Sequence, residues 1–214
     1  MNNALDMVKQ EKIVSIIRLD QADQVEEVAR SLYRGGINII EVTMNTPGAL
    51  EAIRTINHMP EAILVGAGTV LDAASANAAI RAGAKFLLAP TLNTETIKMG
   101  NRYGVPVIPG VMTPTEALTA HEAGATMVKV FPVRSLGPAF AKDMKGPLPQ
   151  TELMAVGGVS AENAGEFFQA GWDAVGIGGS LVNAQLVKEK RFEEIETAAR
   201  KLVDARDKAI QSSK

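Results

Sequence analysis

The sequence predicts an α/β fold, a single closed (β/α)8 barrel, and three observations lead to this prediction. Eight short runs of β-branched and aliphatic residues recur along the chain, separated by Ala- and Glu-rich segments of helical length. The runs are apolar at consecutive positions, as is typical of parallel strands that helices cover. Eight βα units in a row favour a closed barrel over an open doubly wound sheet. The runs span residues 13–19, 37–43, 63–70, 86–90, 105–111, 127–133, 152–159 and 174–180.

The segments between the runs carry the start and stop signals of helices. Capping side chains stand before three of them, and glycines stand where five of them should end. A short helix over about residues 3–11 precedes the first strand and is expected to plug the bottom of the barrel. The last helix, over about residues 190–210, is charged and should pack on the outside. The expected N-caps are Asp72, Thr113 and Ser160, and the expected end glycines are Gly35, Gly83, Gly104, Gly124 and Gly171.

Length and composition indicate one domain over residues 1–214. At 214 residues and 46% hydrophobic content, the chain can bury one sizeable core. A net charge of -2 and the lack of a Lys/Arg-rich run argue against a nucleic-acid partner. The first residues, "MNNALDMVKQEK", do not resemble a signal peptide, and no apolar stretch could span a bilayer. We therefore expect a soluble, cytoplasmic protein without a membrane partner.

The residue types present restrict the chemistry. The chain has no cysteine and two histidines, His58 and His121, which excludes disulfides and thiolate sites and leaves little for a metal. The "GAG" at residues 66–68 lacks the spacing of a dinucleotide-binding motif, so NAD is not expected. We predict no metal and no cofactor. Catalysis would then depend on Lys, Glu, Asp, Arg, Ser, Thr or backbone groups.

A lysine interrupts the apolar run "TMVKVFPV" at residues 126–133. An ammonium group out of water is costly unless it is paired or neutral, and a neutral amine attacks ketones to form an iminium. Lys129 is therefore a candidate nucleophile, and Glu41 is the inward carboxylate that could serve as its base. Two other interpretations remain open: Lys129 and Glu41 form a buried ion pair, or Lys129 reaches the solvent at the barrel mouth.

Other candidates stand at the carboxyl ends of the strands, where (β/α)8 barrels place their active sites. Strand alternation puts Glu41 and Thr43 on one face, and Lys129 and Phe131 on one face, so each pair can point inward together. Thr69 offers a hydroxyl, although a packing role is as consistent with its pattern. Arg18 and Pro90 end the first and fourth strands.

Two double-glycine turns, "VGGVSAEN" at 156–163 and "IGGSLVN" at 177–183, follow the seventh and eighth strands. Many barrels of this type bind phosphate here through backbone N–H groups, because glycine lets the anion come close. The alternative is that these glycines only make tight turns. Two such turns in adjacent units favour phosphate. The expected phosphate-binding residues are Gly157, Gly158, Gly178, Gly179 and Ser180.

Six segments, in this order, resemble the 2-keto-3-deoxy-6-phosphogluconate (KDPG) / 4-hydroxy-2-oxoglutarate (KHG) aldolase family: "GGINIIEVTMNTPGALEAI", "VGAGTVL", "VPVIPGVMTPTEA", "KVFP", "VGGVSAEN" and "GIGGSLV". The resemblance implies a (β/α)8 homotrimer that cleaves a 2-keto acid to pyruvate and an aldehyde without metal. It implies that Lys129 forms a Schiff base and Glu41 moves protons. It further implies that Thr69, Pro90 and Phe131 line the pyruvate pocket and that the double-glycine turns hold phosphate.

Three departures from the family pattern bear on the substrate. Asn45 in "TMNTP" stands where many members have arginine, so Arg18 is expected to bind the substrate carboxylate, with Thr43 and Asn45 beside it. "APT" at 89–91 replaces "SPG". "AVGGV" at 155–159 replaces "PTGGI" and puts Val156 where a hydroxyl would be, which is closer to galactonate-series relatives.

The resulting prediction is a class I lyase that cleaves KDPG to pyruvate and glyceraldehyde 3-phosphate, or KHG to pyruvate and glyoxylate, or both. The galactonate analogue of KDPG (KDPGal) is an alternative substrate. Two further functions remain open. A phosphosugar isomerase or epimerase would use Glu41 as its base, with Lys129 as an electrostatic partner. A barrel that only binds a phosphorylated metabolite would leave the buried lysine unexplained.

Overall fold

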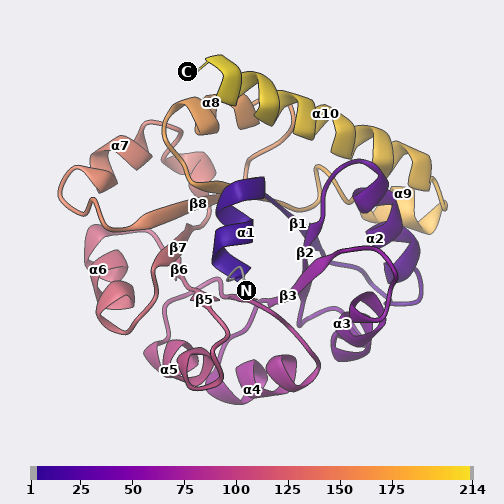
Figure 1. The fold of residues 1–214 in the computed structure, drawn as a ribbon, viewed down its shortest axis with the longest axis horizontal. Coiled ribbons are helices and arrows are strands. Elements are labelled where there is room, and N and C mark those ends of the chain that lie inside the picture. Colours follow the sequence, from indigo (N-terminus) through magenta and orange to yellow (C-terminus); the bar gives the residue numbers. More distant parts are fainter. Residues whose placement is uncertain (1–3, 213–214) are drawn as a thin grey trace.

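The strands form one parallel sheet that curls into a barrel, with the helices around its outside (Figure 1). The computed structural model describes residues 4–212. The sheet order is β5-β4-β3-β2-β1-β9-β8-β7-β6, so neighbours in sequence are neighbours in space. The strands are β1 (Ile13–Ile17), β2 (Ile39–Thr43), β3 (Leu64–Gly68), β4 (Leu87–Leu88), β5 (Val107–Ile108), β6 (Gly110–Val111), β7 (Met127–Val130), β8 (Glu152–Val156) and β9 (Ala174–Ile177).

The barrel closes through the segment predicted as the fifth strand. Pro109 divides this segment into β5 and β6, because proline has no N–H group for the ladder. β5 pairs with β4 on one side, and β6 pairs with β7 on the other. The Pro109 carbonyl accepts a hydrogen bond of 2.8 Å from the backbone N–H of Lys129. One chain segment therefore joins both ends of the sheet order, and the (β/α)8 prediction is confirmed.

Two of the three predicted N-caps, Asp72 and Thr113, are confirmed. Asp72 accepts a 2.7 Å hydrogen bond from the N–H of Ser75, and Thr113 forms a capping box with Glu116. The prediction for Ser160 was wrong. The next helix begins at Ala164, after a turn in which the N–H of Ser160 donates to Asn163 Oδ1 at 2.8 Å.

The helices on the outside of the barrel are α2 (Val25–Arg34), α3 (Ala49–Asn57), α4 (Ala73–Arg81), α5 (Thr94–Tyr103), α6 (Pro114–Glu122), α7 (Phe140–Lys145), α8 (Ala164–Gln169), α9 (Ala184–Lys188) and α10 (Phe192–Ser212), with a 3-10 turn η1 (Val133–Ser135). The long α10 runs along the outside beside α2 and α8, as its charge predicted (Figure 1). No helix within residues 4–212 is long and apolar enough to cross a membrane.

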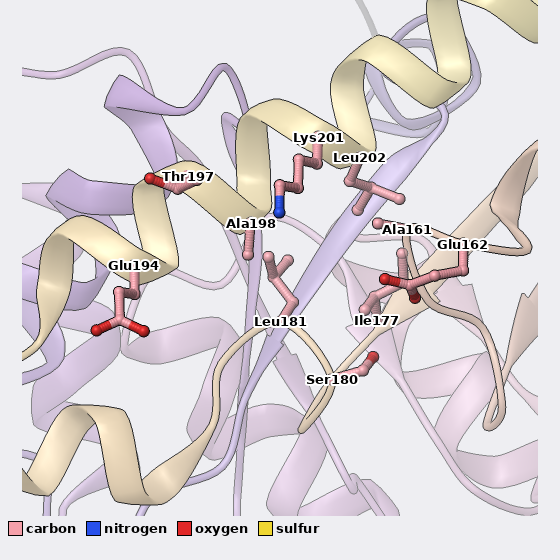
Figure 2. Close-up of a pocket in the computed structure, with 10 residues that line it drawn as sticks. All are labelled: Ala161, Glu162, Ile177, Ser180, Leu181, Glu194, Thr197, Ala198, Lys201 and Leu202. Carbon is pink, nitrogen blue, oxygen red and sulfur yellow. The ribbon is translucent and has the colours of Figure 1, made fainter.

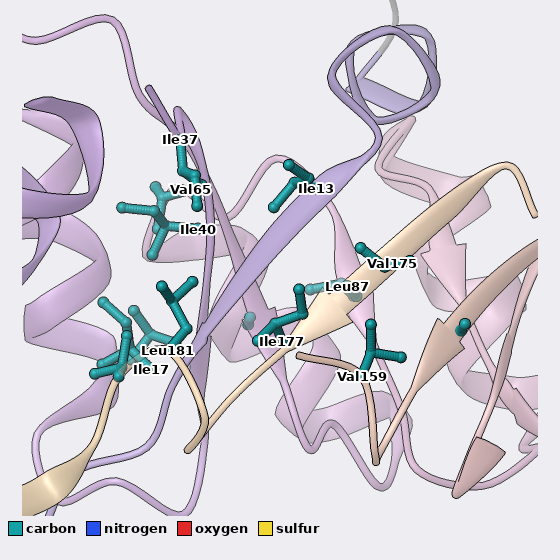
Figure 3. Packing of buried hydrophobic residues seen from close by; sticks show 14 of the residues in the cluster. Ile13, Ile17, Ile37, Ile40, Val65, Leu87, Val159, Val175, Ile177 and Leu181 are labelled. Atoms are coloured by element: carbon teal, nitrogen blue, oxygen red, sulfur yellow. The ribbon is translucent and has the colours of Figure 1, made fainter. Parts of the chain in front are cut away.

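Alternation along the strands separates two apolar layers. Ile13 and Ile17 of β1 face the helices, in the cluster that Figure 3 shows between sheet and helices. Val14 and Ile16 face the barrel interior. The interior layer also contains residues of helix α1 (Ala4–Glu11), which crosses the bottom of the barrel as predicted. The bottom is thus filled, and the carboxyl ends of the strands are left for a site.

Candidate active site

Lys129 lies in β7 and is 6% exposed. Its Nζ atom is 5.1 Å from the centroid of the Phe131 ring, two residues further along the same face. Burial lowers the pKa of Lys129; Glu41 raises it, and the charge of Arg18 lowers it further. We conclude that the amine is shifted towards its neutral, nucleophilic form.

Glu41 lies in β2 and is 1% exposed. Its Oε2 atom has no hydrogen-bond partner within residues 4–212. Burial raises the pKa of Glu41, and the nearby charges of Lys129 and Arg18 lower it by less. The carboxyl group and the amine act on each other through space rather than through a hydrogen bond. Both are shifted towards the neutral forms that imine chemistry requires.

A cavity of 580 Å³ opens at the carboxyl ends of β1, β7, β8 and β9. Arg18, which follows β1, is an exposed part of its wall and has no ion pair in the described part of the chain. Eight of the predicted site residues line this cavity. They are Arg18, Lys129, Phe131, Gly157, Gly158, Gly178, Gly179 and Ser180.

The other predicted residues lie outside the cavity wall. Thr43 is fully buried, and its Oγ1 lies 3.2 Å from Oγ1 of Thr46. The N–H of Leu19 donates to the same Thr46 oxygen at 3.2 Å. These hydroxyls therefore join the loops after β1 and β2. Asn45, in the loop after β2, is exposed and does not line the cavity.

Thr69, which follows β3, and Pro90, which follows β4, are half-buried and do not line the cavity. Thr69 has a φ of +55°, a left-handed conformation that costs a β-branched residue roughly 1–3 kcal/mol. A role for Thr69 in binding the substrate stays a prediction. The Pro90 carbonyl oxygen lies 2.2 Å from where a Cβ of Gly110 would stand, so it packs directly on the segment that closes the barrel.

The two double-glycine turns meet in the cavity wall. Gly157 and Gly158 have φ values of +86° and +109°, which residues with a side chain rarely adopt. The Ser180 hydroxyl donates to the carbonyl of Val159 at 3.0 Å, so it connects the turns to each other. The N–H groups of Gly158, Gly179 and Ser180 have no acceptor within residues 4–212. These N–H groups are available to an anion.

Ser180 also borders a second cavity, of 250 Å³, on the outer side of the same turn. Figure 2 shows this space between the turn and α10, with Lys201 extending from the helix towards Leu181. The turn is therefore a thin wall between two cavities.

One charged residue of the inner cavity wall was not anticipated. Arg134 in η1 lines the cavity together with the glycine turns. The sequence held one signal for it, a basic residue five positions after Lys129, beyond the end of a strand on the face where sites are built. Within residues 4–212, no group of three or more His, Asp or Glu side chains is placed to hold a metal ion.

Comparison with known proteins gives consistent matches. The profile of the KDPG and KHG aldolase family matches residues 5–198. The chain is 31% identical to the 2-dehydro-3-deoxy-phosphogluconate aldolase of Haemophilus influenzae, over 94% of this chain and 95% of that protein. It is 34% identical to the 2-dehydro-3-deoxy-6-phosphogalactonate aldolase of Escherichia coli K12, over 80% of this chain and 85% of that protein.

A solved structure extends the match to three dimensions. The KDPG aldolase of Legionella pneumophila, with pyruvate captured as a covalent carbinolamine, superimposes with a TM-score of 0.85 at 27% identity, over 92% of this chain and 96% of that one. Fold and matches together define a lyase that acts on carbon–carbon bonds. Within that class, the chain belongs to the KDPG and KHG aldolase family.

Proposed function

We propose that this aldolase cleaves a 2-keto-3-deoxy-6-phospho sugar acid to pyruvate and glyceraldehyde 3-phosphate through an imine on Lys129. The observation that carries the proposal is a buried lysine whose pKa is lowered, chiefly by burial, near a buried carboxyl group whose pKa is raised. The Legionella relative, in which pyruvate forms a carbinolamine, supports the same chemistry here.

The steps follow from these two groups. The neutral amine of Lys129 attacks the C2 carbonyl to give a carbinolamine, and Glu41 protonates the hydroxyl that leaves as water. The resulting iminium accepts the electron pair of the C3–C4 bond as that bond breaks. Glu41, now a carboxylate, takes the proton of the C4 hydroxyl, and the aldehyde is released. The enamine is then protonated at C3, and hydrolysis frees pyruvate and the amine.

The two anionic groups of the substrate would bind at different ends of the cavity. Arg18 would bind the substrate carboxylate near Lys129, and the glycine turns would bind the terminal phosphate through their N–H groups. KDPG is the substrate we expect first, and KHG, which lacks the phosphate, would be a poorer one. The homotrimer that the family resemblance implies stays a prediction.

KDPGal is the second candidate substrate, and Val156 favours it. This residue lies in the cavity wall, where it is 4% exposed and offers no hydrogen bond to a substrate hydroxyl. The 34% identity to the phosphogalactonate enzyme of Escherichia coli agrees with this choice. Because KDPG and KDPGal differ in configuration at C4, initial rates on the two compounds decide between them.

Borohydride trapping tests the mechanism. The protein is incubated with pyruvate and borohydride, and its mass is measured. We expect one reduced pyruvate adduct on the wild-type chain and none on Lys129→Ala or Lys129→Arg, since arginine keeps the charge but does not lose its proton. Lys98→Ala, a change at an exposed lysine on α5, is the matched control and should be labelled as the wild type is. A wild-type protein without an adduct would favour the isomerase or epimerase alternative.

A further inference from the structure

Arg134 is held against the glycine turn that follows β8. Its backbone N–H donates to the carbonyl of Gly157 at 3.0 Å. A Cβ atom on Gly158 would lie 2.6 Å from Cβ of Arg134, so the turn can approach Arg134 only because Gly158 has no side chain. The start of the Arg134 side chain is thereby fixed beside the N–H groups that are available to an anion.

Arg134 is exposed, lines the cavity and has no acidic partner within residues 4–212. Some other arginines form ion pairs: Arg30 and Arg54, for example, pair with glutamates on or near their own helices. A guanidinium without an acidic partner, on a residue that contacts the turn with the unbonded N–H groups, can bind an oxyanion together with them. Beside the glycine turns, the cavity therefore has hydrogen-bond donors from Arg134 in addition to the backbone N–H groups.

The two arginines of the cavity wall, Arg18 and Arg134, lie at different ends of the cavity. Arg18 acts electrostatically on both Lys129 and Glu41, which puts it at the reacting end. No such interaction connects Arg134 with Lys129 or Glu41. Arg134 instead contacts the turn of Gly157 and Gly158, at the other end.

We propose that Arg134 is a specificity-determining residue, which binds the terminal phosphate monoester of the substrate together with the glycine N–H groups. The proposal rests on the proposed function, since it names the group at the far end of the 2-keto acid. Backbone N–H groups alone can donate hydrogen bonds to any small anion. A guanidinium adds a full positive charge and a planar pair of donors. Arg134 would then set the preference for a phosphate dianion over an uncharged hydroxyl.

The first test compares two substrates, a phosphorylated 2-keto-3-deoxy acid and the same acid without phosphate. Arg134→Ala should lower the ratio of their kcat/KM values by about 10- to 100-fold, the scale of a charge-assisted hydrogen bond. Arg134→Lys should keep part of the preference, because it keeps the charge and loses the two-pronged donor. Arg102→Ala, at an exposed position on α5, is the matched control and should keep the wild-type ratio. An unchanged ratio in Arg134→Ala would overturn the proposal.

The second test does not depend on turnover. Glycerol 3-phosphate should raise the melting temperature of the wild type in a concentration-dependent way, glycerol should not, and Arg134→Ala should lose most of the effect. If pyruvate is not trapped but this difference is seen, the proposed function fails and the role of Arg134 stands. If pyruvate is trapped and glycerol 3-phosphate stabilises both proteins equally, the role of Arg134 fails alone.

Discussion

The carboxyl group of Glu41 occupies the space in which a side chain of Gly68 would stand. A Cβ atom on Gly68 would lie 1.4 Å from Oε1 of Glu41 and 2.2 Å from its Cδ. The two residues are on adjacent strands, since Gly68 pairs with Thr43 in the parallel ladder of β2 and β3. The glycine at the end of "GAG" thus leaves the room in which the proposed proton-transfer group is held.

Gly68→Ala should therefore displace the Glu41 carboxyl group. We expect kcat for aldol cleavage to fall by about 10² or more, the scale of losing a general acid–base group. Gly165→Ala is the matched control. Gly165 lies in α8, and no atom stands within 4 Å of its missing Cβ, so alanine there should leave kcat unchanged and stabilise the fold by up to about 1 kcal/mol.

Stability separates displacement of Glu41 from a general effect on the backbone. Gly68→Ala should cost less free energy of unfolding in a Glu41→Ala background than in the wild type, because the overlapping carboxyl group is then absent. Urea unfolding of the four proteins measures this difference. Equal costs in the two backgrounds would mean that the overlap with Glu41 is not the cause.

Glu41→Gln should lower kcat by about 10² and remove from the pH profile of kcat the limb that belongs to the carboxyl group. A change confined to KM would instead make Glu41 a binding residue.

The same substitution should increase the free energy of unfolding, although it lowers kcat. Because the folded pKa of Glu41 is raised, its contribution is full below the unfolded value of about 4.3 and is lost as the pH rises through the folded value. Glutamine stays neutral, so the free energy of unfolding of the variant should increase relative to that of the wild type as the pH rises.

Lys129→Met should abolish cleavage and stabilise the fold near neutral pH. The folded pKa of Lys129 is lowered, so its contribution is present above the unfolded value of about 10.4 and is lost as the pH falls through the folded value. Methionine fills similar space without a charge. The advantage of the variant in urea unfolding should therefore be larger at about pH 7 than at about pH 10. The reverse trend would contradict a lowered pKa.

Arg18→Lys should weaken pyruvate binding by about 1–2 kcal/mol, and Arg18→Ala by more, if Arg18 binds the carboxylate with its two-pronged donor. Asn45→Ala should do much less, since Asn45 is exposed and outside the cavity wall. Pyruvate affinity from imine trapping measures both effects. If Arg18 acts through Glu41 instead, Arg18→Ala should shift the pH profile of kcat and leave pyruvate affinity unchanged. No change in either measurement would remove Arg18 from the site.

The sequence by itself determined the barrel and its two central side chains. Consecutive apolar runs and helix signals report burial along each element, and this local information was enough to count the βα units. Lys129 stood out because a charge inside such a run has few explanations. Alternation along β2 then turned Glu41 and Thr43 to the same inward face, and both are buried there.

Contacts between strands were decided by the tertiary structure alone. Gly68 lies against Glu41, and Gly158 against Arg134, because strand register and barrel closure bring segments far apart in sequence to the same height. Pro109 likewise turned one predicted strand into two ladders that close the barrel. A periodic pattern records which way a side chain points but contains no information on its neighbour across the ladder. The space for Glu41 and the contact between Gly158 and Arg134 could therefore not be predicted from the sequence.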